Sequence, residues 1–291
     1  MIKNKNTTLG RLSLLITTLI WGTSFVIQKN TLDDISTLYL LAIRFTIAAV
    51  LLFLMGIKDV RKLNRSYFKG GSLMGLALAA AYIVQTYGLV YTTPGKNAFL
   101  TASYCVMTPF FYWAYKKKRP GKHNVIAAVL CILGVGLISI DGGMNVNFGD
   151  ILTLVCGIFY AIHLIITDEH AVGKNPALLT AIQFAVAAVI TWILAVLVEP
   201  FPANIPTGAV FSIGYLGVMC TAICYLLQTF GQKNTPASQA AIILTLESVF
   251  GTVISIIFYK EPMNFRLVLG FIAMFLAVLI SETKLSFLKK K

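Results

Sequence analysis

The sequence predicts an all-α polytopic membrane protein, with ten transmembrane helices arranged as two inverted five-helix repeats. Three observations lead to this fold class. Of the 291 residues, 57% are hydrophobic and only 12% are charged, and the mean hydropathy is +0.81. An ordinary soluble domain carries about 25% charged residues, so this composition does not suit a water-exposed surface. The chain also contains ten long apolar runs, and parts of its first half recur in its second half.

Each apolar run is long enough to cross a bilayer, whose hydrocarbon core of about 30 Å needs roughly 20 residues of helix. The runs cover residues 12–28, 36–57, 71–91, 94–115, 123–140, 149–167, 176–198, 208–231, 236–259 and 265–282. The first run follows a basic lead but no cleavage pattern follows it, so we expect a retained signal anchor. The short connections leave no room for a separate soluble domain.

Positive charge predicts the orientation of these runs. If the N-terminus is cytoplasmic, 19 of the 24 Lys and Arg residues lie on the cytoplasmic side. The N-terminal tail holds three, the connections after the second and fourth runs hold five each, two later connections hold one each, and the C-terminal tail holds four. Positive residues concentrate on the cytoplasmic side of membrane proteins. We therefore expect a cell-membrane protein with both termini in the cytoplasm, and we attribute the net charge of +13 to topology beside anionic lipid rather than to nucleic-acid binding.

An internal repeat divides the chain into residues 1–148 and 149–291. At an offset of 139, Ala42, Ile43, Phe45, Ala48, Ala49 and Val50 match Ala181, Ile182, Phe184, Ala187, Ala188 and Val189. At an offset of 143, Gln85 matches Gln228, and at 142 Thr93 and Pro94 match Thr235 and Pro236. Because each copy contains an odd number of runs, the second copy enters the membrane from the other side. Inverted repeats of this kind support alternating access in secondary transporters.

Several short motifs resemble one membrane-protein family. These are Trp21-Gly22 with Phe25, Arg44-Phe45 followed by Ala48-Ala49, and the fourth and ninth runs that begin near Pro94 and Pro236. Together with the ten runs, they resemble the EamA-type branch of the drug/metabolite transporter superfamily. This resemblance implies an exporter of amino acids, related metabolites or drugs, with a cavity between the repeats and the fourth and ninth runs near its centre. It does not specify a substrate.

Polar residues inside the runs should face the bundle interior or a cavity. Matched stripes at helical spacing occur in the first run (Thr17, Trp21, Ser24, Gln28) and in the sixth (Cys156, Tyr160, His163, Thr167). Further stripes lie in the fourth and ninth runs. The predicted substrate-binding residues are Trp21, Ser24, Gln85, Tyr104, Tyr160, His163 and Gln228. Two alternatives stay open: the hydroxyl groups bond their own helices, and His163 either packs in the interior or relays protons.

Two charges inside the runs require an explanation, because a charge at membrane depth costs at least about 2.5–3.5 kcal/mol. We take Glu247 as the one acidic residue inside a run, and Arg44 as the one basic residue. Either the two form a buried ion pair, or Glu247 carries a coupling proton or meets a substrate amine while Arg44 attracts a carboxylate. Glu247 lies off the hydroxyl stripe, so periodicity does not place it in the cavity. Pro109 and Gly251, at matched levels of the fourth and ninth runs, are predicted gate hinges, with simple packing as the alternative.

The sequence predicts no enzyme, metal or cofactor. Cys220 and Cys224 have a spacing that a metal could use, but no third ligand is evident nearby. There is no His-Glu-x-x-His motif, paired carboxylate, Gly-x-Ser-x-Gly motif or phosphate-binding loop. We predict a proton-coupled secondary exporter of small metabolites such as amino acids, acting as a monomer or homodimer. The alternatives are an exporter of drugs or lipophilic cations and, from other classes, an uncoupled channel or a membrane-embedded enzyme.

Overall fold

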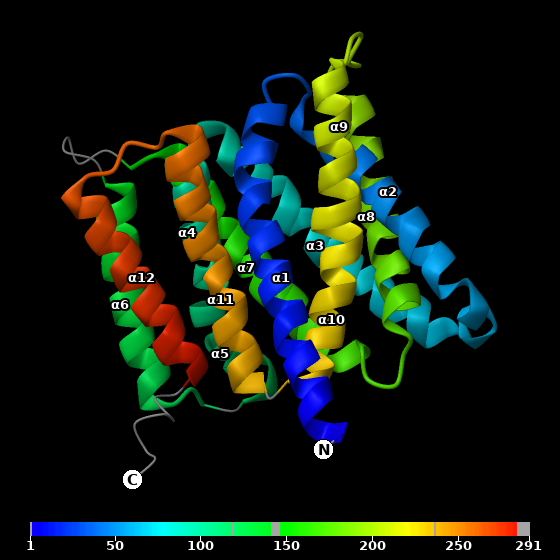
Figure 1. The fold of residues 1–291 in the computed structure, drawn as a ribbon, viewed down its shortest axis with the longest axis horizontal. Coiled ribbons are helices and arrows are strands. Elements are labelled where there is room, and N and C mark those ends of the chain that lie inside the picture. Colours follow the sequence, from blue (N-terminus) through cyan, green and yellow to red (C-terminus); the bar gives the residue numbers. More distant parts are fainter. Residues whose placement is uncertain (1, 118, 141–145, 236, 284–291) are drawn as a thin grey trace.

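The computed structural model describes residues 2–117, 119–140, 146–235 and 237–283, with side chains at all of these except 2–6, 233, 237–242 and 282. Its described elements are helices, packed into one elongated bundle (Figure 1). In chain order they are α1 (Ile2–Thr31), α2 (Thr37–Gly56), η1 (Ile57–Lys62), α3 (Arg65–Tyr91), α4 (Pro94–Thr101), α5 (Ser103–Lys116), α6 (Lys122–Ser139), α7 (Phe148–His170), α8 (Pro176–Val198), α9 (Thr207–Tyr215), η2 (Leu216–Ile223), α10 (Cys224–Asn234), α11 (Ala237–Ile254), η3 (Ser255–Tyr259) and α12 (Phe265–Thr283).

Asparagine side chains mark several helix starts. Asn64, Asn147 and Asn175 each accept hydrogen bonds from backbone N–H groups in the first turn of α3, α7 and α8. Asn264 does the same for Leu267 at the start of α12, over 2.9 Å. These caps satisfy N–H groups that the helix itself leaves without partners.

Seven helical segments are long and apolar enough to cross a membrane within the described residues, and two further apolar helices are shorter. The large apolar side chains on the outside suit contact with lipid: Leu197 and Phe211 are each 75% exposed, and Ile132 is 70% exposed. The protein therefore has the make-up of a polytopic all-helical membrane protein. The division into ten spans stays a prediction. The predicted fourth span is divided at Ala102 into α4 and α5, and the eighth and ninth contain the wider π-helical turns η2 and η3.

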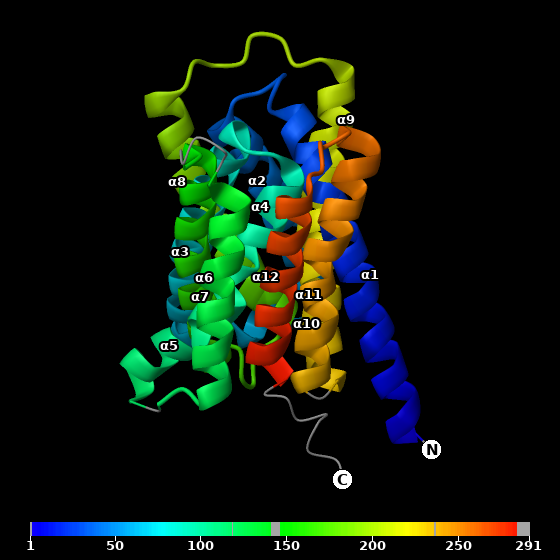
Figure 2. The same ribbon diagram turned by 90° about the vertical axis from the view of Figure 1, so that its left-hand side faces the viewer.

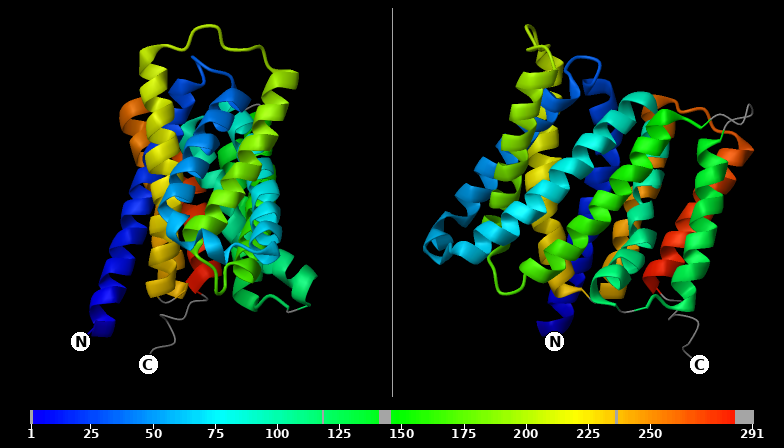
Figure 3. Two further views of the ribbon diagram at one scale, coloured as in Figure 1. Left: turned by 90° about the vertical axis from the view of Figure 1, so that its right-hand side faces the viewer. Right: turned by 180° about the vertical axis from the view of Figure 1, so that it is seen from behind.

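The helices pair across the two halves of the chain. α2 packs along α8, α3 along α7, α6 along α12, and α1 against both α10 and α11. α6 and α12 form one edge of the bundle and α2 and α8 the other (Figures 1 and 3). α1 begins and α12 ends at the same end of the bundle, which we call the terminal end. The connection over residues 199–206 arches over the opposite end, which we call the far end (Figure 2).

Two helix crossings, one at each end of the bundle, are both packed closely through glycines. At the far end, a Cβ on Gly88 of α3 would lie 2.7 Å from Thr153 Oγ1 and 3.0 Å from the Gly149 oxygen of α7. At the terminal end, a Cβ on Gly231 of α10 would lie 2.5 Å from Leu14 Cγ and 2.9 Å from the Gly10 oxygen of α1. Glycine at these positions lets the backbones touch.

Candidate functional site

A cavity of about 80 Å³ lies in the centre of the bundle, between helices of both halves. Its walls come from α1, α2, α3, α4, α5, α7, α10 and α11. The lining side chains are Trp21, Ser24, Phe25, Gln28, Arg44, Tyr82, Gln85, Asn97, Thr101, Tyr104, Tyr160, His163, Leu164, Tyr225, Gln228 and Glu247. The seven predicted substrate-binding residues and the two predicted charged residues are all among them. The structure thus brings these nine residues together, while their roles stay predictions.

Arg44 projects from α2 with only 1% of its surface exposed. Its Nη1 donates to Gln28 Oε1 at 2.7 Å, its Nε donates to Thr221 Oγ1 at 2.6 Å, and its Cζ lies 4.9 Å from the centre of the Tyr82 ring. A buried guanidinium needs hydrogen-bond acceptors. Here neutral groups provide them, so the positive charge of Arg44 is held in place but not neutralised by these contacts.

Glu247 reaches the same cavity from α11. The ion pairs among the described residues are Lys62–Asp59, Lys96–Asp150 and Lys116–Glu169. An Arg44–Glu247 ion pair is therefore not present in this part of the chain, and the simple pairing explanation of the two charges is wrong for this conformation. Both charges instead face one cavity.

The π-helical turn η2 contacts two residues of the cavity wall, Arg44 and Trp21. A π turn is wider than an α turn and often occurs at functional sites. The Thr221 hydroxyl donates to the Leu216 oxygen at 2.7 Å and accepts from Arg44, while the Cys220 oxygen accepts from Trp21 Nε1 at 2.8 Å. The π turn thus accepts hydrogen bonds from two cavity residues, Arg44 and Trp21.

Aromatic rings form much of the lining. The ring centres of Tyr82 and Tyr160 are 5.8 Å apart, those of Tyr104 and Tyr160 are 5.9 Å apart, and those of Trp21 and Tyr225 are 5.6 Å apart. Tyr82 and Tyr225 also line the cavity but are not among the residues predicted from the sequence. A signal was available, because each precedes a predicted glutamine by three residues and the two tyrosines match at the offset of 143 that relates those glutamines.

The other predicted residues differ in how they are held. His163 Nε2 lies 3.0 Å from Gln183 Oε1, and Tyr160 donates to Gln85 Oε1 at 2.8 Å. Ser24 donates to the Trp21 oxygen of its own helix at 2.6 Å, which fits the structural alternative for hydroxyl groups. Gln228 lines the cavity from α10.

The two predicted hinges differ in their surroundings: Pro109 lies within a helix, and Gly251 lies at a contact between two helices. Pro109 lies inside α5, seven residues after the break at Ala102. A Cβ on Gly251 would lie 2.8 Å from the Ala98 Cβ of α4, so this glycine allows close packing of α11 on α4. Hinge motion at either residue stays a prediction.

The five cysteines are all buried and none forms a disulfide. Cys220 and Cys224 lie near backbone oxygens of α1, with their sulfur atoms 3.8 Å and 3.9 Å from the Ile20 and Thr17 oxygens. Within the described residues, no group of His, Cys, Asp and Glu has the arrangement of a metal site.

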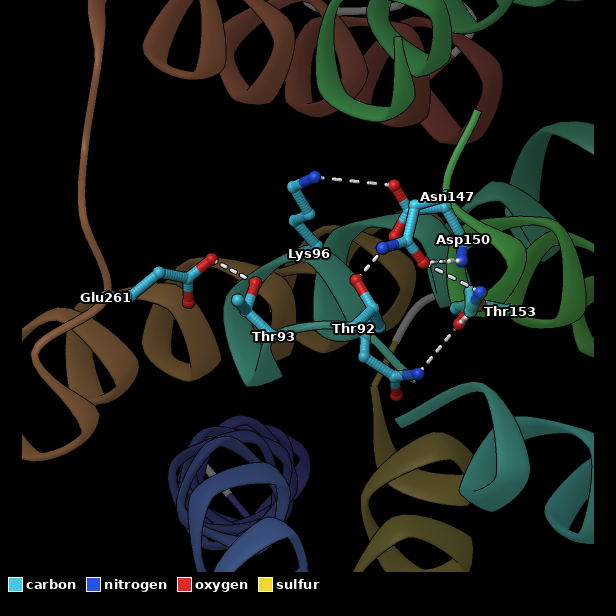
Figure 4. Close-up of polar contacts among 9 residues, drawn as sticks. Thr92, Thr93, Lys96, Asn147, Asp150, Thr153 and Glu261 are labelled. Atoms are coloured by element: carbon cyan, nitrogen blue, oxygen red, sulfur yellow. Dashed lines mark hydrogen bonds and ion pairs between the residues drawn. The ribbon is translucent and has the colours of Figure 1, made fainter. Parts of the chain in front are cut away.

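The count of acidic residues inside the spans needs correction. Asp150 lies in the first turn of α7 and is fully buried, and Glu261, just after η3, is 5% exposed. Figure 4 shows both carboxylates beside the segment that joins α3 to α4. Glu247 is therefore not the one acidic residue inside a predicted span, because the span 149–167 contains Asp150. Arg44 is likewise not the one basic residue, because the span 94–115 contains Lys96 and the span 265–282 contains Arg266.

The model of the EamA-like transporter family matches the chain twice, over residues 8–140 and 147–283. The chain belongs to the EamA-like transporter family. Relatives of this EamA-family protein include an uncharacterized transporter of Archaeoglobus fulgidus, which is 30% identical over 277 residues and matches 92% of this chain and 84% of its own length. An uncharacterized transporter of Clostridium kluyveri is 23% identical, with 97% of this chain and 96% of that protein covered. The uncharacterized transporter YoaV of Bacillus subtilis is 24% identical, with 89% and 91% covered.

A solved structure described as a crystal structure of protein has the same fold. It superimposes with a TM-score of 0.68 at 14% identity, covering 97% of this chain and 99% of that chain. The family and its relatives identify the chain as a transporter, so its partners are a small-molecule substrate and membrane lipid.

Proposed function

We propose that this EamA-family protein is a secondary active exporter of small amphoteric metabolites such as amino acids. It works by alternating access through the central cavity. Because 19 of the 24 positive residues lie on one predicted side, we place it in the cell membrane with both termini in the cytoplasm.

The proposed machinery consists of two five-helix halves, residues 1–148 and 149–291, inverted with respect to each other. Three observations support it. The family model matches once in each half. α2 packs on α8 and α6 on α12, which are the helices that the repeat makes counterparts. The Gly88–Gly149 crossing has a counterpart in the Gly231–Gly10 crossing.

The proposed substrate class depends on one observation: Arg44 and Glu247 line the same cavity but form no ion pair with each other. Arg44 is positioned by Gln28 and Thr221 and can bind a substrate carboxylate. Glu247 can bind a substrate ammonium group. An amphoteric molecule supplies both partners, whereas a substrate with several phosphates would favour several cationic residues in the pathway.

The size of the cavity indicates which conformation the structure represents. At about 80 Å³ it is well below the roughly 300–1,000 Å³ of typical ligand sites. It has room for a few water molecules but not for an amino acid. The aromatic side chains must therefore move apart before a substrate enters, so we assign this conformation to a contracted, substrate-free state.

Proton coupling is proposed through Glu247. An ionised carboxylate with no cationic partner is costly in a poorly solvated site, so either a proton or a substrate ammonium stabilises it. Exclusive binding of one or the other would couple inward proton movement to outward substrate movement.

Counterflow in proteoliposomes tests the proposal. Vesicles preloaded with an unlabelled amino acid should accumulate the same radiolabelled amino acid faster than empty vesicles, because a carrier exchanges substrate across the membrane. Arg44→Gln should abolish this exchange, while Lys58→Gln in η1 should leave it unchanged. Flux with no acceleration by internal substrate would indicate a channel and contradict the proposal.

The tyrosines and Trp21 that line the cavity together with Glu247 favour a second substrate class, lipophilic organic cations. Aromatic faces attract organic cations. Exchange of a lipophilic cation that survives Arg44→Gln, together with no exchange of any amino acid, would assign the protein to that class.

A further inference from the structure

A short segment at the far end, Thr92–Gly95, comprises the connection between α3 and α4 and the first two residues of α4. It is bound on two sides by buried carboxylates (Figure 4). On one side, Asp150 of α7 accepts hydrogen bonds from the Thr92 hydroxyl and, at 3.4 Å, from Lys96 Nζ. On the other side, Glu261 accepts from the Thr93 hydroxyl and, at 2.9 Å, from the Gly95 backbone N–H.

The two carboxylates have a full set of partners within the protein. Glu261 also accepts from the Ser255 hydroxyl at the start of η3, so it ties the segment to the end of α11. Asp150 belongs to a helix start that Asn147 caps. Neither carboxylate touches the central cavity, so their role is not to bind the substrate there.

The segment leads directly into the cavity wall. It begins α4, whose Asn97 and Thr101 line the cavity. Asn97 Nδ2 donates to Thr153 Oγ1 of α7 at 2.8 Å and to the Gln85 oxygen of α3 at 3.3 Å, while Gln85 Nε2 donates to Thr101 Oγ1 at 2.9 Å. Displacement of the segment would therefore move α4 relative to α7 at the cavity.

The fold alone does not require this arrangement, as the repeat-related positions at the terminal end show. At the same offsets, Asp150 corresponds to Arg11 and Glu261 to Arg119, while Thr93 corresponds to Thr235. The Thr235 hydroxyl is buried and has no hydrogen-bond partner among the described residues. Thr153 corresponds to Leu14, which cannot form the Asn97 bond. The Asp150 and Glu261 bonds thus have no counterpart carboxylates at the repeat-related positions of the terminal end, where a different carboxylate, Glu169 of α7, bonds Tyr115 and Lys116 of α5.

We propose that Asp150 and Glu261 latch the Thr92–Gly95 segment and hold the pathway closed at the far end. Opening of the cavity at that end requires the segment to leave both carboxylates. The inference rests on the proposed alternating-access function, and it names the residues that keep one gate shut.

The latch can be tested by side-specific labelling, with no substrate needed. Ser24→Cys places a thiol in the cavity wall, and replacement of the five native cysteines by alanine or serine removes other targets. Labelling by a membrane-impermeant maleimide is then measured from each side of the membrane, with a C-terminal tag reporting which side is which. In the combined variant Asp150→Asn with Glu261→Gln, labelling of the introduced thiol from the far-end side should rise at least tenfold.

A matched control comes from Glu199, a carboxylate at the same end. It accepts hydrogen bonds from the Leu38 and Tyr39 N–H groups at 2.9–3.3 Å and from the Tyr87 hydroxyl at 2.8 Å. These bonds connect α8 with α2 and α3, helices that pack along their length. Glu199→Gln should therefore leave the labelling rate within twofold of its starting value.

Three outcomes would overturn the latch. They are an unchanged rate in the double variant, an equal rise in Glu199→Gln, or a rise in labelling from the terminal-end side only. If the double variant does not yield folded protein, Thr93→Val removes a single hydroxyl while keeping a similar shape, and it should still raise the far-end rate two- to fivefold. Because labelling uses no substrate, failure of the transport proposal would appear in the exchange experiment and not here.

Discussion

The two ends of the bundle share their packing but differ in their bonding. At the far end, Gly88 and Gly149 bring α3 and α7 into contact, and at the terminal end Gly231 and Gly10 do the same for α10 and α1. The far end adds the carboxylates of Asp150 and Glu261, whereas arginines occupy the corresponding positions at the terminal end.

This difference indicates how a repeated structure acquires a preferred conformation. Two identical halves would give two exchangeable states of equal free energy. Hydrogen bonds to charged groups contribute roughly 1.5–3 kcal/mol each. In the proposed alternating-access cycle, the bonds to Asp150 and Glu261 would favour closure at the far end, while the shared packing would keep the other state accessible.

The largest expected effect is the loss of a latch carboxylate. Glu261→Ala would leave the Thr93 and Ser255 hydroxyls and the Gly95 N–H without their acceptor in a buried site. We expect a loss of about 3–5 kcal/mol, because each buried donor left without an acceptor costs about 1–3 kcal/mol. Thermal unfolding in detergent measures it. The repeat-related variant Arg119→Ala changes an exposed side chain and should alter the free energy of unfolding by no more than about 0.5 kcal/mol. Equal losses of stability in the two variants would show that the two ends do not differ in this way.

The shared packing predicts a smaller effect that is similar at both ends. Gly88→Ala would press a methyl group against Thr153 Oγ1 and the Gly149 oxygen, and Gly231→Ala would press one against Leu14 and the Gly10 oxygen. Overpacking costs about 1–3 kcal/mol. We expect the two variants to lower the unfolding temperature by comparable amounts. A loss confined to one of them would show that the two crossings are not equivalent.

The smallest effect is expected at Thr235, in a comparison of the two repeat-related threonines. Thr93→Val removes a hydrogen bond to a carboxylate and should cost about 1.5–3 kcal/mol. Thr235→Val replaces a buried hydroxyl that has no partner among the described residues, so it should be neutral or stabilise by up to about 1 kcal/mol. Urea or thermal unfolding of the pair gives the comparison directly. Destabilisation by Thr235→Val comparable to that by Thr93→Val would mean that the terminal end has its own polar latch.

Sequence reasoning located the helices and the cavity residues because membrane helices impose a strong pattern. A polar residue at depth must face inward, so Trp21 and Tyr160 are recognisable from their place on the polar stripes. Glu247 stands out by its charge alone, and its periodicity does not predict that it lines the cavity. Tyr82 and Tyr225 were missed because tyrosine is partly apolar and gives a weaker signal than glutamine.

The latch could not be found this way, because it depends on pairs far apart in the sequence. Thr93 and Glu261 are 168 residues apart, and Glu261 lies in the connection between the ninth and tenth predicted runs, outside the stripes that the sequence pattern marks. The turn η2 was also missed. Its apolar sequence continues smoothly from α9 to α10, so nothing in the sequence marks the wider backbone turn over Leu216–Ile223.

The most direct test of the whole account compares two activities of Glu247→Gln in proteoliposomes, using a radiolabelled amino acid that the wild-type protein exchanges. The account predicts that exchange persists, because the amide keeps the shape of the side chain, while net transport driven by a pH gradient falls to the background of empty vesicles. Net transport that survives undiminished in Glu247→Gln would contradict proton coupling through this residue.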